Sequence, residues 1–173
     1  MWAATVDRLT AGATARWLLP AGWPGHLAFA VCVSATGVFA IITSQSAVVT
    51  ALLTLCLHYI VGLCGSFALH ELSHALVLLR ADGVTSVTLE RTAWRISVRA
   101  TGAIRGRDAF LAALAGPGGC AVAGGILLLA CPHALLHVWF FVHAVFLLPV
   151  FGDGRALISG ARRWDRRLGE ITP

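Results

Sequence analysis

The sequence has few charged residues and no lysine. Only 12% of its 173 residues are charged, about half the share found in soluble domains, and 58% are hydrophobic. All 13 basic residues are arginine. So small a share of charge, with a mean hydropathy of +0.81, excludes an ordinary soluble domain. It predicts an α-helical polytopic membrane protein in which a few helices form one compact bundle.

The chain also lacks closely spaced cysteines. Its five cysteines form no Cys-x-x-Cys pair, and all but Cys131 lie well inside apolar segments. This distribution disfavours a disulfide framework or a thiolate metal site. We therefore expect the cysteines to be small, buried side chains of helices.

Four apolar segments stand out and predict about four transmembrane helices. They cover residues 27–43, 47–79, 109–130 and 134–151. The second would be roughly 50 Å long as one helix, whereas the hydrocarbon core of a bilayer is about 30 Å thick. It must therefore tilt, bend near Gly62 and Gly65, or protrude from the membrane.

Arginine is distributed asymmetrically around these segments. It occurs before the first segment, between the second and third, and after the fourth, but not in the loops 44–46 and 131–133. The positive-inside rule then predicts that both termini and the central loop face the cytoplasm. We expect an integral protein of the cell membrane. This topology and contact with anionic lipid explain the net charge of +5, so we expect the lipid bilayer but no nucleic acid as a partner.

The central loop has the pattern of a β-hairpin. Apolar and polar residues alternate from Trp94 to Arg99, which is typical of a strand with one buried face. Val87 and Leu89 offer a partner strand, with a turn near 91–93. We expect a small hairpin, about 84–100, at the cytoplasmic surface between the second and third helices.

We expect two carboxylates to lie at membrane depth, one inside the second apolar segment and the other two residues after the fourth. Glu71 is the only charged residue between Trp17 and Leu79, and Asp153 is the only one between residues 109 and 154. Glu71 belongs to the sequence HELSH, in which His70 and His74 are four apart and share a helix face. Such an HExxH pattern is typical of two imidazoles that bind zinc beside a glutamate that acts on water. Random ordering of this composition would produce it about 0.005 times per chain.

A catalytic zinc site needs a third protein ligand, and depth in the membrane favours Asp153. His74 and Asp153 both lie close to an arginine-rich end of their segments. His143 would lie about 15 Å away from that depth if its segment were helical, and His58 misses by a similar margin. We expect these two and the other three histidines, His26, His133 and His137, to occupy packing or interface positions. A hydrogen-bonded cluster of His70, Glu71 and His74 without a metal remains the alternative.

The third segment carries a stripe of small residues. Ala112, Gly116, Cys120 and Gly124 recur every four residues, which lets a neighbouring helix approach closely. We expect this stripe to pack against the HExxH helix. Pro117 removes one backbone hydrogen bond, so a freed backbone group near it could face the metal or the substrate.

Together these motifs resemble the site-2-protease-like intramembrane zinc metalloproteases, the M50 peptidases. The resemblance covers about 47–156 and rests on HELSH, on LAGPGGC and on LLPVFGDGRAL. It implies that His70, His74 and Asp153 bind one zinc ion and that Glu71 is the catalytic base. The chain departs from the family pattern where Cys120 replaces an asparagine, and where the approach to Asp153 is shortened.

The resemblance implies an endopeptidase that cleaves transmembrane protein substrates within the membrane. The hairpin around 94–98 would hold a locally unwound substrate by strand addition. The expected organisation is an interfacial segment 1–26, a protease core 27–156 and a basic tail 157–173. A catalytically degenerate metal-binding relative is the alternative, which Cys120 keeps open. A transporter fits less well because no inverted repeat is visible. The sequence leaves the oligomeric state open.

Overall fold

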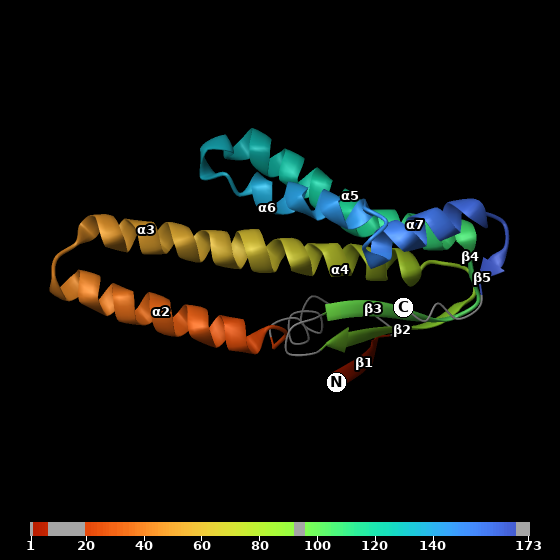
Figure 1. The fold of residues 1–173 in the computed structure, drawn as a ribbon, viewed down its shortest axis with the longest axis horizontal. Coiled ribbons are helices and arrows are strands. Elements are labelled where there is room, and N and C mark those ends of the chain that lie inside the picture. Colours follow the sequence, from red (N-terminus) through yellow and green to blue (C-terminus); the bar gives the residue numbers. More distant parts are fainter. Residues whose placement is uncertain (1, 7–19, 92–95, 169–173) are drawn as a thin grey trace.

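The computed structural model describes residues 2–6, 20–91 and 96–168, and this part of the chain is mostly helical. Helix α2 (Trp23–Ile42) and helix α3 (Ser46–Leu57) form an antiparallel pair (Figure 1). Both are apolar on all sides, as expected of helices that face lipid. The ring of Phe29 stacks on Tyr59 with centroids 3.7 Å apart, which fixes α2 against the helix that follows α3.

The second apolar segment forms one helical element from Ser46 to Leu78, 33 residues long. It passes from α3 through a π-helical stretch, η1 (His58–Cys64), into α4 (Gly65–Leu78). The π-helical turns include Gly62, one of the two glycines at which a bend was among the expected possibilities. A Cβ atom at Gly62 would lie 2.8 Å from Cγ of Trp139, so the glycine permits close packing there.

The fourth apolar segment is broken instead of forming one continuous helix. A short helix α6 (His137–Phe141) continues as 3-10 turns, η3 (Val142–Leu147), and a 50° bend separates these from α7 (Gly152–Arg162). Leu148 begins the bend with an extended backbone, ψ 143°, as expected for a residue that precedes proline. The described residues thus contain three helices long and apolar enough to span a membrane, or four if the bent pair forms one span.

Helix α5 (Gly106–Ala130) packs along α4 on the side away from α2 and is followed by a single 3-10 turn, η2 (Pro132–Ala134). Figure 1 shows α5, α6 and α7 together on this side of the long helix. The small-residue stripe of α5 is buried, and Gly119 packs on Ser73 of α4. The expectation that this stripe faces the HExxH helix is confirmed for Ala112, Gly116 and Cys120, whereas Gly124 packs on Phe140 and Phe141 of α6.

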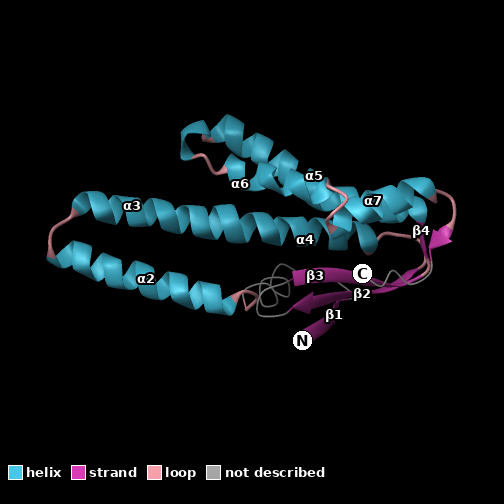
Figure 2. Ribbon diagram, in the orientation of Figure 1, coloured by secondary structure: helices cyan, strands magenta, loops and turns pink. Residues whose placement is uncertain are grey.

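The predicted hairpin is present as β2 (Val84–Arg91) and β3 (Ile96–Gly102), paired in antiparallel register with Leu89 opposite Val98. Arg91, where the turn was expected to begin, still belongs to β2, and residues 92–95, Trp94 among them, lie outside the described residues. A third strand that the sequence pattern did not indicate, β1 (Trp2–Val6), pairs with the other edge of β2, giving the order β1-β2-β3. Figure 2 shows the strands gathered beside α4 at one end of the molecule.

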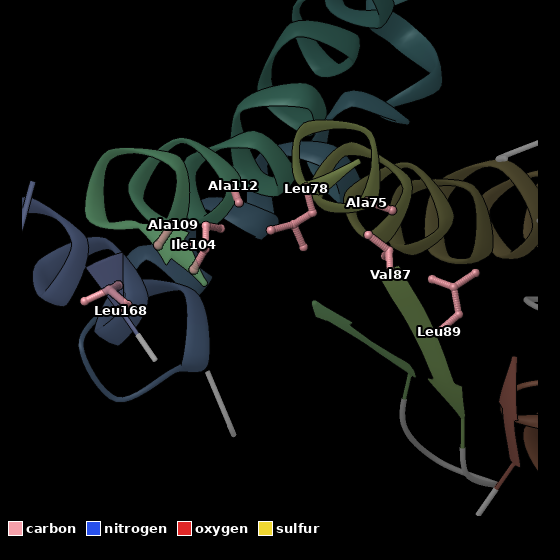
Figure 3. Packing of buried hydrophobic residues seen from close by; sticks show 8 residues of the cluster. All are labelled: Ala75, Leu78, Val87, Leu89, Ile104, Ala109, Ala112 and Leu168. Atoms are coloured by element: carbon pink, nitrogen blue, oxygen red, sulfur yellow. The ribbon is translucent and has the colours of Figure 1, made fainter. Parts of the chain in front are cut away.

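The hydrophobic core lies where this sheet meets the helices. Val87 and Leu89 of β2 point at Ala75 and Leu78 of α4 (Figure 3). A second, two-stranded sheet pairs β4 (Ile104–Arg105) with β5 (Arg167–Leu168), so part of the expected tail is folded against the start of α5. Both sheets therefore hold the ends of α4, α5 and α7 together.

Candidate metal centre

The two histidines of the HExxH pattern lie on one buried face of α4. Because they are one helical turn apart, their Nε2 atoms come within 3.0 Å of each other. Only 4% of His70 and 8% of His74 is exposed. Both Nε2 atoms point toward the start of α7.

Asp153 lies in the first turn of α7 and reaches both histidines. Its Oδ2 lies 3.1 Å from Nε2 of His70 and 3.4 Å from Nε2 of His74. The bend before α7 makes this contact, and Gly154 permits it because a Cβ there would collide with the carbonyl of Leu148. The structure therefore brings His70, His74 and Asp153 together, as the sequence predicted, into a group that could hold a metal ion.

The hydrogen bonds around these residues suit a cation. Nδ1 of His74 lies 2.6 Å from the carbonyl oxygen of Ala112, which only accepts, so this nitrogen carries the proton. In a neutral ring, Nε2 of His74 then presents a lone pair. The carboxylate of Asp153 also only accepts. Acceptors aimed at one point are stabilised by a cation or a proton between them, and two imidazoles with one carboxylate are a common zinc-binding set.

Glu71 lies beside this group without being one of the three converging residues. Its side chain is partly buried on α4, and it interacts electrostatically with His74 and with Cys120 of α5. A carboxylate near a candidate metal position is a candidate general base.

The structure adds His143, which the sequence argument had placed too far away. Its Nδ1 lies 3.2 Å from Nδ1 of His70, and only 2% of the residue is exposed. The expectation was wrong because it extrapolated a straight helix from Asp153, whereas the chain bends between Leu148 and Phe151. Pro149 was the signal that could have warned against that extrapolation.

A second group that could hold a metal ion consists of His70, Cys120 and His143. It shares His70 with the first group. Sγ of Cys120 donates to the backbone carbonyl of Ser66 at 3.3 Å, so this thiol already has a partner. The expectation that the cysteines are small helical residues holds for Cys120, which is fully buried, whereas Cys32 is exposed.

Two of the other histidines make packing contacts, as expected. His26 binds the hydroxyl of Tyr59 at 2.6 Å, and His58 accepts a hydrogen bond from Nε1 of Trp139 at 3.0 Å. Both contacts join α2 or α6 to the η1 region. They lie outside the groups that could hold a metal ion among the described residues.

The backbone contact from α5 to the site comes from Ala112, through its bond to His74. Pro117 lacks an N–H group and so releases the carbonyl of Ala113, one residue further along. The carbonyl that contacts the site is therefore a neighbour of the one that the proline frees.

Gly116 is the point where α5 lies closest to the histidines. A Cβ there would lie 2.9 Å from Cε1 of His70 and closer still to the His74 ring. We expect Gly116→Ala to lower the free energy of unfolding by about 1–3 kcal/mol, because the rings have no room to move away. Thermal unfolding in detergent would measure it.

Gly118→Ala is the matched control, since no described heavy atom lies within 4 Å of a Cβ at that position. Alanine there should leave the protein as stable as the wild type or raise the free energy of unfolding by up to about 1 kcal/mol. Equal stabilities for the two variants would contradict the close approach at Gly116.

Comparison with known proteins gives no match: no family model, no curated protein and no solved structure matches this chain. The function of the chain is therefore inferred from the site itself.

Proposed function

We propose that the chain is a site-2-protease-like intramembrane zinc metalloprotease that hydrolyses peptide bonds of membrane-embedded proteins. The observation that carries the proposal is the convergence of His70, His74 and Asp153 from two distant apolar segments, with Glu71 beside them. Isolated charges in such segments are costly, at about 2.5–3.5 kcal/mol each on insertion scales. A bound divalent cation offsets that cost, because its charge neutralises the carboxylates, and would explain why the three residues converge.

In this proposal His70, His74 and Asp153 hold one zinc ion and leave a position open for substrate. Zinc bound there would supply a Lewis acid that acidifies a water molecule and polarises the scissile carbonyl. Glu71 takes a proton from the attacking water as the water oxygen bonds to the carbonyl carbon. Glu71 then gives that proton to the leaving amine nitrogen as the C–N bond breaks, so water is added across the peptide bond.

Substrate delivery is proposed to use the edge of the three-stranded sheet. A transmembrane helix shields its carbonyls in hydrogen bonds, so a scissile segment must first unwind. Strand β3 is the edge of the β1-β2-β3 sheet and contacts α4, the helix that carries the histidines. An extended substrate segment paired with β3 would therefore lie along the helix that carries the histidines.

The proposed topology places both termini and the sheet on the cytoplasmic side of a cell membrane, with the bent pair as a fourth span. The arginine pattern supports this arrangement. The site lies at the end of α4 that adjoins the sheet, so cleavage would occur near the cytoplasmic end of a substrate helix.

The proposal is tested by mapping new N-termini in the membrane proteome of cells that produce the wild type, His70→Ala or His58→Ala. His58 is the control because it packs on Trp139 away from the site. We expect new termini inside apolar segments with the wild type and His58→Ala, and their loss with His70→Ala. If the wild type binds zinc but produces no such termini, the chain is a metal-binding protein without protease activity.

A further inference from the structure

His143 is a buried titratable side chain that the proposed reaction does not use. It lies in η3 and contacts His70 through Nδ1 at 3.2 Å and the Ser66 hydroxyl through Nε2 at 3.1 Å. The ring of Phe67 packs edge-on to the His143 ring with centroids 4.7 Å apart, and the centroid of the Phe146 ring lies 5.4 Å from that of His143. Both neighbours are apolar and offer no hydrogen-bond partner to the His143 ring.

The direction of each hydrogen bond follows from the Ser66 hydroxyl. Ser66 donates its proton to the backbone carbonyl of Leu63 at 3.1 Å, so its oxygen accepts from Nε2–H of His143. A neutral His143 then has its lone pair on Nδ1. That lone pair accepts the proton from Nδ1–H of His70.

The acceptor at His143 favours the Nδ1–H tautomer of His70, in which the lone pair of Nε2 is directed at Asp153 and His74. Oδ2 of Asp153, 3.1 Å from Nε2, favours the other tautomer, so a cation bound at Nε2 and the bond to His143 act in the same direction. His74 is held in the Nδ1–H tautomer by the carbonyl of Ala112. Both rings therefore present Nε2 to the same point. A ligating histidine commonly donates its other N–H to a neighbouring acceptor, which fixes the ring and raises its basicity.

We propose that His143 and Ser66 are positioning residues that fix the tautomer and orientation of His70 for metal binding. The inference rests on the metal centre of the proposed function, but not on proteolysis itself. A neutral imidazole suits this role in an apolar segment because, unlike a carboxylate, it accepts the proton of His70 without bringing another charge into the membrane.

The experiment uses the full chain purified in detergent, with Co²⁺ as a spectroscopic probe and Zn²⁺ as competitor. His143→Leu removes the acceptor, and Ser66→Ala removes the group that orients it. We expect each to weaken metal binding about 10–100-fold. His143→Asn places an amide oxygen near the position of Nδ1 and should recover most of the affinity.

His137→Leu is the matched control. It removes a histidine from the same segment, and within the described part of the chain Nδ1 of His137 has no hydrogen-bond partner. We expect wild-type affinity for this variant. Since His143→Leu could fail to fold, Ser66→Ala, the smaller change, also carries the test, with thermal unfolding of each metal-free variant as the check.

Nitrogen NMR of the imidazoles in the metal-free protein reads the tautomer directly. We expect His70 as the Nδ1–H form in the wild type and His137→Leu, and a mixture of forms in His143→Leu. The inference is overturned if His143→Leu keeps wild-type affinity and tautomer, or if His143→Asn binds as weakly as His143→Leu. A sulfur-to-cobalt charge-transfer band in the wild type would also overturn it, because the metal would then lie between Cys120 and His143.

These results separate the two proposals. A wild type without metal affinity contradicts the proposed function, and the NMR measurement still decides whether His143 sets the tautomer of His70. A wild type that binds zinc, with His143→Leu indistinguishable from it, leaves the metal centre in place and removes only the positioning role.

Discussion

Glu71→Gln should abolish peptide hydrolysis while leaving zinc bound. Glutamine keeps the size and polarity of the side chain but cannot take a proton from water. Loss of a general base costs about 10²–10⁴-fold in rate, so turnover in proteoliposomes should fall at least to that extent. Metal content should remain that of the wild type, because His70, His74 and Asp153 are the residues whose ligand atoms converge.

The matched control is Asp82→Asn, another carboxylate-to-amide change in the same region of the chain. Asp82 follows α4 and has a side chain 78% exposed, paired with Arg107 at 3.8 Å. We expect wild-type turnover and metal content. If Glu71→Gln cleaves substrate at the wild-type rate, Glu71 is not the base; if it loses the metal, Glu71 is a ligand.

The sequence predicted the three converging residues because each left a local signal. HExxH places two imidazoles on one helix face whatever the rest of the fold does, since the helical repeat alone aligns residues four apart. Asp153 was found because its depth in the membrane matches that of His74, and because a carboxylate at that depth is costly without a partner. The cost of placing a charge in the membrane thus linked His70 to Asp153, 83 positions further along the chain.

The alternating pattern around Leu89 and Val98 predicted the hairpin for a similar reason. A strand with one buried face requires a period of two, and that period is visible in the sequence. Pairing between distant strands leaves no such mark. Strands β1 and β5 are short and join partners far along the chain, so their existence depends on a tertiary arrangement that composition and period do not reveal.

His143 was missed because its depth was measured along an ideal helix. A helical rise describes the helical element from Ser46 to Leu78, but it fails where the chain bends at Pro149. The ring nitrogens of a buried histidine can also hydrogen-bond to a hydroxyl or to another histidine. The residue type alone therefore does not distinguish a functional site from ordinary packing. The directions of the hydrogen bonds make that distinction.

Asp153→Ala should remove zinc from the purified protein. The wild type should hold about one zinc per chain, and the variant should bind it at least about 100-fold more weakly, because losing a direct ligand costs more than losing an outer partner of one. Metal analysis after dialysis and competition against a chelator would measure both values. His74→Ala should give a similar result, since it removes another of the three converging atoms.

Asp165→Asn is the control, an exposed acidic residue beyond α7 that lies outside both groups of candidate ligands among the described residues. It should bind zinc as the wild type does. If Asp153→Ala also retains full affinity, the metal does not bind between α4 and α7. The remaining group is then His70, Cys120 and His143, and Cys120→Ser should release the metal. Because His74 and Asp153 belong only to the first group, and Cys120 and His143 only to the second, these variants decide between the two positions.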